Sequence, residues 1–587
     1  MTLQRARAAA HPRRDVWLAT AAVLLFFFLA VDSLVGDSPT MDEQNHIARG
    51  IAFLRTGDPR LSLEHPPLVN AMSALPLLTM PELRLPTDHP SWERREGWYE
   101  FADLFLWQYN HDATRVVFLA RLPVVFLLLA LALAGYRFAR RLWGGSAGLM
   151  ALALLLFEPN LMAHGRYATT DLGGTLFTFL ATTMLWRLWQ SPDRWAWRRW
   201  ALAAGAIGLA FGSKLSALGF ALVWAVLAVL PLYPIGRRGP ARAALYRLAQ
   251  LAGAGVMALV VVWGIFAFQW GSFQFSSPEL QALNAWSGPM PTFWAGVEQV
   301  ARLGSSGRSQ SFLLGRFSDD GFLAYFPVAF AVKTPLVLLG ALALAAVLLL
   351  RDQTTRQRAA FLLLAAALFF GLTMLSALNI GYRHALPALP FLLVVISGLA
   401  GERQRSRRLT DQLAPEKLVT SKATRLWVAS WRQLASLGIV AALIGAALWI
   451  HPHYLSYFNL AAGGPANGYR VLIDSNVDWG QDLLRLRQWM ADEGVNRVRL
   501  GWFGSADPGY YGLAYEPLPG IGRAEFFPLW WNPPFDPTRP EPGVYAISAT
   551  SLWETPLRPD EKQVYAWFRA REPDDRVGYS ILIYDVP

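Results

Sequence analysis

Two adjacent carboxylates, Asp42 and Glu43, follow the first apolar segment of the chain after only a few residues. That segment, 16–35, is long enough to cross a bilayer as a helix. Four arginines precede it, and basic flanks stay on the cytoplasmic side, so the chain is predicted to emerge outside. A carboxylate at that surface could take a proton from a membrane-borne substrate. An isolated Asp-Glu pair, however, is more often part of a solvated loop.

The first outer loop is predicted to span 36–115 and to hold more than the acidic pair. Apolar residues recur at helical spacing over 43–54, which favours a helix along the membrane surface. The run Glu64-His65-Pro66-Pro67-Leu68 predicts a second helix, because proline suits a first helical turn. His65 is an equally good candidate for substrate contact and for packing or capping.

A short outer loop at 158–171 gathers one histidine, one arginine and one aspartate, which are His164, Arg166 and Asp171. Such a cluster at a helix boundary could bind a substrate or serve as an interfacial anchor. Asp171 could also cap the helix that follows it.

Two cationic features are predicted on the same outer side. Lys333 precedes Thr334-Pro335 near the outer end of its span, and a tight turn between two later spans holds Tyr382, Arg383 and His384. Lysine and arginine at such positions often only extend toward the membrane surface. They are also the donors that phosphate oxygens prefer. Carboxylates and cations together predict group transfer with an anionic leaving group.

The composition is that of a polytopic membrane protein. Of 587 residues, 54% are hydrophobic and 16% charged, against about a quarter charged in soluble domains. The net charge of +11 does not indicate nucleic-acid binding, because the arginines lie between apolar segments, as expected for cytoplasmic loops. The absence of cysteine excludes disulfides, thiol catalysis and cysteine-ligated zinc.

Alternating loops predict eleven spans in a multi-pass protein of the cell (plasma or inner) membrane, with a cytoplasmic N-terminus. The predicted spans are 16–35, 116–138, 146–157, 172–189, 200–212, 215–233, 248–268, 328–350, 359–379, 385–400 and 434–450. A second large outer loop covers 269–322 and is rich in aromatic residues. It could guide a prenyl chain, close over the site or form an interfacial aromatic belt.

The tail is predicted to be a small extracytoplasmic α/β domain at 451–587, following a membrane domain at 1–450. Strand-like runs occur at 469–473, 497–503, 544–549 and 579–584, and 481–492 has helical periodicity. Strand, helix and strand in succession favour an α/β arrangement.

These motifs resemble the GT-C superfamily of polyprenyl-phosphate-sugar-dependent glycosyltransferases, and within it the protein O-mannosyltransferase and aminoarabinose-transferase branch (bacterial, glycosyltransferase family 39-like). The resemblance covers roughly 16–400. It rests on Asp42-Glu43, Glu64-His65-Pro66-Pro67-Leu68, Thr169-Thr170-Asp171, Lys333-Thr334-Pro335 and Tyr382-Arg383-His384 with Leu386-Pro387, in family order. The tail, with the run 474–482, resembles the C-terminal extension of bacterial members and not the sugar-binding trefoil domain of eukaryotic ones.

The resemblance implies an inverting transferase with a GT-C membrane fold. The donor would be a polyprenyl-phosphate sugar among membrane lipids, and the acceptor a hydroxyl on a lipid, glycan or protein. Asp42 would act as general base, and Glu43 would position the acceptor or share that role. Lys333, Arg383 and His384 would stabilise the leaving phosphate. The remaining candidate substrate-binding residues are His65, His164, Arg166, Asp171 and Tyr382.

This scheme requires no cofactor and no metal, although Asp42, Glu43, His65 and Asp171 could form an oxygen-rich divalent site. Two other classes remain open. A lipid-linked-sugar transporter or flippase would place ionisable groups at mid-membrane, whereas the predicted spans are nearly free of charge. A non-catalytic scaffold of a surface-glycan complex is the third alternative.

Overall fold

Long apolar helices form the body of the protein. The computed structural model describes residues 12–587 except 95, 192–195, 308–309, 402–421 and 521–530. Within that part of the chain, five helices are long and apolar enough to cross a membrane. They belong to α1 (Pro12–Val35), α5 (Ala113–Trp143), α11 (Pro240–Ile265), α15 (Arg356–Met374) and α18 (Lys422–Ile450). The protein is therefore a helical, multi-pass membrane protein, as predicted.

A sixth candidate span is broken. The predicted straight span 328–350 consists of α13 (Tyr325–Lys333) and α14 (Leu336–Arg351), which meet at 108°. The break falls at Thr334-Pro335, because proline has no amide proton and disfavours helical geometry in the residue before it. The bend leaves Lys333 at the end of a helix.

The remaining predicted spans correspond to helices that are too short, or in the case of α8 not apolar enough, to belong to that set. They are α6 (Gly145–Phe157), α8 (Asp171–Trp189), α9 (Trp197–Phe211), α10 (Phe220–Val229) and α16 (Leu389–Ser397). The count of eleven spans therefore stays a prediction. The basic leader before residue 12 and most of the arginine-rich loop after residue 400 lie outside the described residues.

The predicted first outer loop, 36–115, contains two closely packed helices, and the sequence predicted both. They are α2 (Glu43–Thr56) and α3 (Pro67–Ala74), followed by α4 (Trp98–Asp103). At Gly50 the two helices approach so closely that a Cβ would lie 2.1 Å from the carbonyl oxygen of Asn70. This contact packs the middle of α2 against α3.

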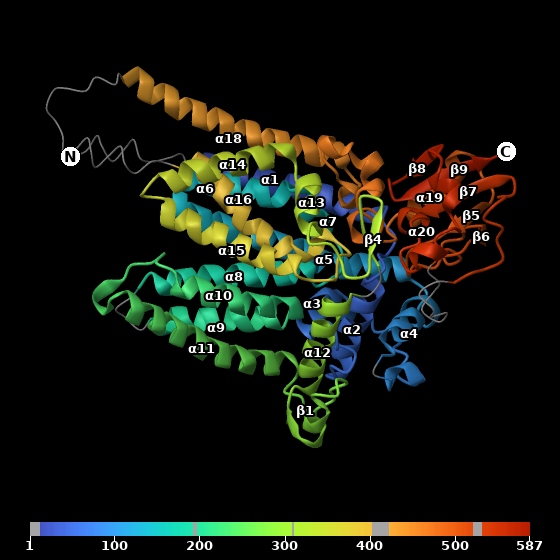
Figure 1. Cartoon of the computed structure of the whole chain (residues 1–587), viewed down its shortest axis with the longest axis horizontal. Helices are drawn as coiled ribbons and strands as arrows, with labels where there is room; N and C mark the ends of the chain where they lie inside the picture. The colour runs from blue at the N-terminus through green and yellow to red at the C-terminus, as the bar shows by residue number, and fades with distance from the viewer. Residues whose placement is uncertain (1–11, 95, 192–195, 308–309, 402–421, 521–530) are drawn as a thin grey trace.

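The second outer loop carries two hairpins around α12 (Pro291–Ser306). Strands β1 (Trp270–Ser272) and β2 (Ser287–Pro289) pair antiparallel, as do β3 (Ser311–Leu313) and β4 (Arg316–Ser318). Trp270 and Trp286 are largely exposed. Figure 1 shows β1 beside α12 at the edge of the molecule, near the end of α11.

The C-terminal sheet has five strands in the order β6-β5-β7-β9-β8 and lies at one end of the helical bundle (Figure 1). Its strands are β5 (Val498–Gly501), β6 (Tyr515–Pro517), β7 (Gly543–Ser548), β8 (Asp575–Val577) and β9 (Ile581–Val586), preceded by α19 (Leu483–Asp492). Strand β5 is parallel to β6 and β7, whereas β9 is antiparallel to β7 and β8.

The helix and three of the four strands predicted in the tail are present, but the prediction of a strand at 469–473 is wrong. The 3-10 turn η12 (Pro465–Arg470) ends there. The carbonyl of Val471 accepts a hydrogen bond from the amide of Leu314, beside β3. The segment is hydrogen-bonded to the loop beside β3 and is not a strand of the sheet.

Candidate functional site

The site is built around an ion pair between two residues that lie 341 positions apart. Asp42 precedes α2, and Arg383 lies in the turn η7 (Tyr382–His384). Nη1 of Arg383 donates a 2.8 Å hydrogen bond to Oδ2 of Asp42. The Asp42 side chain keeps 22% of its exposure and that of Arg383 keeps 9%. The carboxylate is therefore held by a cation and is still accessible to a substrate.

Asp171 joins this pair to a second cation. Its Oδ2 lies 3.7 Å from Nη1 of Arg383 and accepts a 3.1 Å hydrogen bond from the hydroxyl of Thr169. Its other oxygen pairs with the ammonium of Lys214. Asp171 is 2% exposed. Its contacts with the two cations and with Thr169 offset the free energy that is lost when a carboxylate is removed from water. Lys214 lies between the predicted spans 200–212 and 215–233 and was not among the predicted site residues.

Two histidines lie against each other beside this group. The rings of His46 and His65 meet edge to face with centroids 4.6 Å apart. Nδ1 of His46 lies 2.9 Å from Oδ1 of Asn70, and Nδ1 of His65 lies 3.2 Å from the hydroxyl of Thr170. Burial, together with the nearby charge of Arg49, lowers the pKa of His46 to about 4. Burial also lowers the pKa of His65. Both rings are neutral at pH 7.

Three buried polar atoms around Arg383 have no hydrogen-bond partner within the described part of the chain. They are Nε of Arg383, Nε2 of His384 and Nδ1 of His164. Burial lowers the pKa of His164 to about 3, although Asp171 opposes that effect, and burial lowers the pKa of His384 as well. Buried polar groups are normally paired, so these three atoms are candidates for hydrogen bonds to a ligand.

Glu43 is placed differently from its neighbour. Its Oε1 accepts hydrogen bonds of 2.8 Å from Nε of Arg121 and from the amide of Ala168. Its Oε2 accepts from Nη2 of Arg121 at 2.7 Å and from the amide of Thr40 at 2.8 Å. The side chain is fully buried. In this geometry Glu43 holds Arg121 and the loop backbone and has no free face for an acceptor.

Arg166 is likewise engaged inside the protein. It pairs with Asp37 and donates 2.8 Å and 2.9 Å hydrogen bonds to the carbonyl of Ser33 and the hydroxyl of Tyr167. Asp37 also pairs with Arg485 of α19. Burial raises the pKa of Asp37, but Arg166 and Arg485 lower it more, and the result is about 2. These contacts join the first outer loop to the tail.

Lys333 is 2% exposed and contacts the tail. Its Nζ donates to the carbonyl oxygens of Leu455 at 2.7 Å and Asn476 at 2.5 Å. Two of its three protons are thus used within the chain. Tyr382 is also buried, and its amide donates a 2.9 Å hydrogen bond to Oδ1 of Asn476.

The tail residues near Arg383 were missed by the sequence reasoning, although their motif was noticed. The ring of Trp479 lies under the guanidinium of Arg383, 4.2 Å from its carbon. Burial raises the pKa of Asp474 to about 6, whereas Arg383 lowers it. The clustering of polar side chains in Asp474–Asp482, directly after the last predicted span, was the signal in the sequence that could have assigned this motif to the site.

The same segment gives a prediction about pH. Asp478 is fully buried, and its Oδ2 accepts a 2.8 Å hydrogen bond from the amide of Thr550. Burial raises its pKa from 3.8 to about 8 although these hydrogen bonds oppose the shift. A carboxyl group whose pKa is raised on folding contributes stability that is fully present below its unfolded pKa of 3.8. This stability is lost as the pH rises through the folded pKa of about 8. We expect Asp478→Asn to flatten the fall in thermal stability between pH 5 and 8. An unchanged pH profile would contradict a protonated Asp478.

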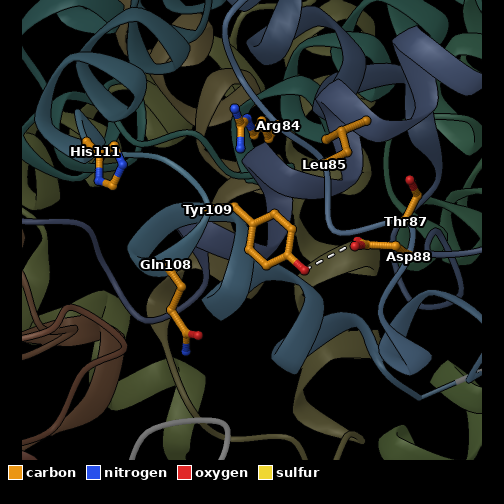
Figure 2. A pocket seen from close by; sticks show the side chains of 7 residues that line it. All are labelled: Arg84, Leu85, Thr87, Asp88, Gln108, Tyr109 and His111. Atoms are coloured by element: carbon orange, nitrogen blue, oxygen red, sulfur yellow. Dashed lines mark hydrogen bonds between the residues drawn. The ribbon is translucent and has the colours of Figure 1, made fainter.

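A hollow of about 600 Å³ also occurs in the first outer loop (Figure 2). Its lining residues are Arg84, Leu85, Thr87, Asp88, Gln108, Tyr109 and His111. The Tyr109 hydroxyl donates a 3.3 Å hydrogen bond to Asp88 across it. None of the predicted site residues lines this hollow.

The residues suggested for a divalent ion do not form a ligand set. No group of three or more histidine, aspartate or glutamate residues is suitably gathered within the described ranges. Glu43 is taken by Arg121, Asp171 is taken by Lys214, and His65 lies against His46. The site is instead rich in cations.

Part of the chain matches a known protein family. Residues 99–274 match the family described as dolichyl-phosphate-mannose-protein mannosyltransferase. This range includes His164, Asp171 and Lys214, and it ends before Arg383. The match confirms the resemblance to GT-C glycosyltransferases and the prediction of an enzyme. No curated protein matches the chain.

Two solved structures are similar over much of the chain. ArnT from Cupriavidus metallidurans bound to undecaprenyl phosphate is 15% identical, with a TM-score of 0.49 and 97% of each chain covered. An oligosaccharyltransferase from Archaeoglobus fulgidus in the apo form is 12% identical, with a TM-score of 0.40, over 75% of this chain and 56% of that one. The family match, rather than these structures, carries the assignment.

Proposed function

We propose that the chain, which matches a glycosyltransferase family over residues 99–274, transfers a sugar from polyprenyl phosphate to an acceptor hydroxyl, with inversion, on the outer face of the membrane. The ion pair between Asp42 and Arg383 carries this proposal. It places an accessible carboxylate next to a cation whose Nε still lacks a partner in the described chain.

The geometry supports one displacement with two roles. Asp42 takes the proton of the acceptor hydroxyl while its oxygen bonds to the anomeric carbon. The bond from that carbon to the phosphate oxygen breaks, and the polyprenyl phosphate leaves with the electron pair. Arg383 stabilises the charge that develops on the phosphate. Because the oxygens of Glu43 are bound by Arg121, Asp42 acts as the single base.

The neutral histidines fit the same scheme. His164 and His384 can donate to or accept from sugar hydroxyls or phosphate oxygens without adding charge, since their pKa values lie below 6.5. Lys214 holds Asp171 ionised beside Arg383. The acceptor remains open among lipid, glycan and protein hydroxyls.

The direct test uses purified protein in lipid with labelled polyprenyl-phosphate sugars and a panel of acceptors. A transferase consumes the donor and labels an acceptor. A flippase moves the donor between leaflets without consuming it, and a scaffold does neither. Movement without consumption, or neither result, would reject the proposal.

Membrane orientation gives a prediction independent of substrate. We expect a reporter fused after Pro587 to report the outer compartment, and one inserted near Gln412, outside the described residues, to report the cytoplasm. The physical reason is that arginine-rich loops remain cytoplasmic. If both reporters give the same side, the acidic pair and the tail do not share a compartment.

Arg383 gives a second prediction. Lysine keeps the charge but has no forked set of donors. A charge-assisted hydrogen bond contributes about 1.5–3 kcal/mol, so Arg383→Lys should raise the KM for the lipid-phosphate donor about tenfold to a hundredfold. The measurement is the dependence of turnover on donor concentration. Arg60→Lys, at a partly exposed ion pair with Asp58, is the matched control. A wild-type titration curve for Arg383→Lys would reject the forked phosphate contact.

A further inference from the structure

The C-terminal segment Asp474–Asp482 lies against the turn that holds residues 380–382 and against α13. The hydroxyl of Ser475 donates to the carbonyl of Ile380 at 2.9 Å. Oδ1 of Asn476 accepts from the amide of Tyr382, and its Nδ2 donates to the hydroxyl of Tyr325, each at 2.9 Å. The segment is therefore bonded to the turn that carries Arg383.

The fit at this turn is close. A Cβ on Gly381 would lie 2.1 Å from Oγ of Ser475, so the turn and the segment could not approach in this way with a larger residue there. Lys333 adds a hydrogen bond from the end of α13 to the carbonyl of Asn476. These contacts come from η7 and from the end of α13, which carry the two cationic motifs of the predicted site.

Trp479 contacts Arg383 and the residue that precedes Asp42. Its carbonyl oxygen accepts a 2.7 Å hydrogen bond from the amide of Met41, the residue before Asp42. Its ring lies under the guanidinium of Arg383 at 4.2 Å. The ring is 1% exposed, and the rings of His164 and Tyr167 meet it edge to face at 5.9 Å and 6.1 Å.

We propose that this C-terminal segment completes the transfer site, with Trp479 as the positioning residue that holds Arg383 in line with Asp42. The inference rests on the proposed function and assigns a role to the tail within it. An aromatic face attracts a guanidinium and fixes its plane. With the plane fixed, Nη1 faces Asp42 and Nε remains for the phosphate. The backbone bond to Met41 sets the position of the base from the same residue.

A purely structural role for Trp479 would give a different result. A buried tryptophan that only packs would change stability and leave the kinetic constants of the folded protein unaltered. A tryptophan that orients Arg383 changes the KM for the donor and the turnover in proportion to how well its ring attracts the cation. Stability and kinetics must therefore be measured on the same full-length preparations.

The first experiment compares Trp479→Phe and Trp479→Leu in the purified full-length protein. We expect Trp479→Phe to keep most activity, and Trp479→Leu to raise the KM for the polyprenyl-phosphate sugar at least tenfold per folded molecule. The matched control is Trp224→Leu, because Trp224 is also 1% exposed and lies in α10, where its N–H bonds Thr182. It should lose stability and retain wild-type kinetic constants.

The second experiment keeps the shape of the side chain, so folding is preserved. Fluorinated tryptophans incorporated at position 479 alone reduce the negative charge of the ring face in steps. We expect the donor KM to rise with each fluorine. A flat response, together with wild-type kinetics for Trp479→Leu, overturns the inference while the proposed function stands. An inactive wild-type protein with every lipid-phosphate sugar overturns both.

Discussion

Asp42→Asn is expected to lower turnover by about a hundredfold to ten-thousandfold, the usual cost of losing a general base. Asparagine has the same shape, and its Oδ1 can still accept the hydrogen bond that Arg383 now donates to the carboxylate. It cannot take a proton from the acceptor hydroxyl. The measurement is transfer from the lipid-phosphate donor per folded molecule, with thermal unfolding as the check on folding.

The adjacent carboxylate provides a sharp comparison for Asp42→Asn. Glu43→Gln removes a charge that is bound by Arg121 and has no exposed face. Its main effect should be lower stability, because the buried Arg121 loses its counter-ion. Near wild-type turnover for Asp42→Asn would reject the proposed base. Loss of turnover in a stable Glu43→Gln protein would move that role to Glu43.

The sequence predicted the parts of the site that depend on sidedness and local periodicity. Helix α2 and the start of α3 follow from apolar spacing and from the Pro66-Pro67 turn. Positive charge on inner loops places Asp42, Asp171 and Arg383 on one side of the membrane. The order of these motifs along the chain then indicated a common site, and the structure joins all three.

What the sequence could not predict is which partner each polar residue takes. Asp42 and Glu43 are neighbours, but the first residue before a helix and the first residue in it point to different surroundings. One therefore contacts Arg383 and the other Arg121. Arg121 lies in an apolar run, where spacing alone gives no reason to expect that its donors hold residues 34–43.

The predicted domain boundary at residue 450 separates two segments that contact each other in the folded protein. The composition changes there, which predicts a separate domain, and all five strands of the C-terminal sheet do come from the tail. Yet Ser38 and Met41 donate backbone hydrogen bonds to Gln481 and Trp479. Such contacts join segments more than 400 residues apart, and no local pattern encodes them.

The largest effect expected on stability comes from Asp37→Asn. Asp37 is buried between Arg166 and Arg485 and accepts a 2.8 Å hydrogen bond from the hydroxyl of Tyr167. Removing one partner of a buried ion pair costs about 3–5 kcal/mol, because the remaining charges are left without compensation. Arg166 loses this carboxylate and Arg485 keeps only Asp482, so the outer loop and the start of α19 should separate more easily. Thermal unfolding of the purified protein measures this loss.

Asp58→Asn is the matched control for Asp37→Asn, since Asp58 lies in the same loop and its ion pair with Arg60 is partly exposed. Exposed pairs contribute about 0–1 kcal/mol, so that variant should unfold near the wild-type temperature. The stabilities of the two variants should also respond differently to acid. The pKa of Asp37 is lowered from 3.8 to about 2, so its contribution is present above pH 4 and is lost as the pH falls through 2. Asp37→Asn should remove that part of the acid dependence. Equal unfolding temperatures for the two variants would show that the buried network does not hold the outer loop to the tail.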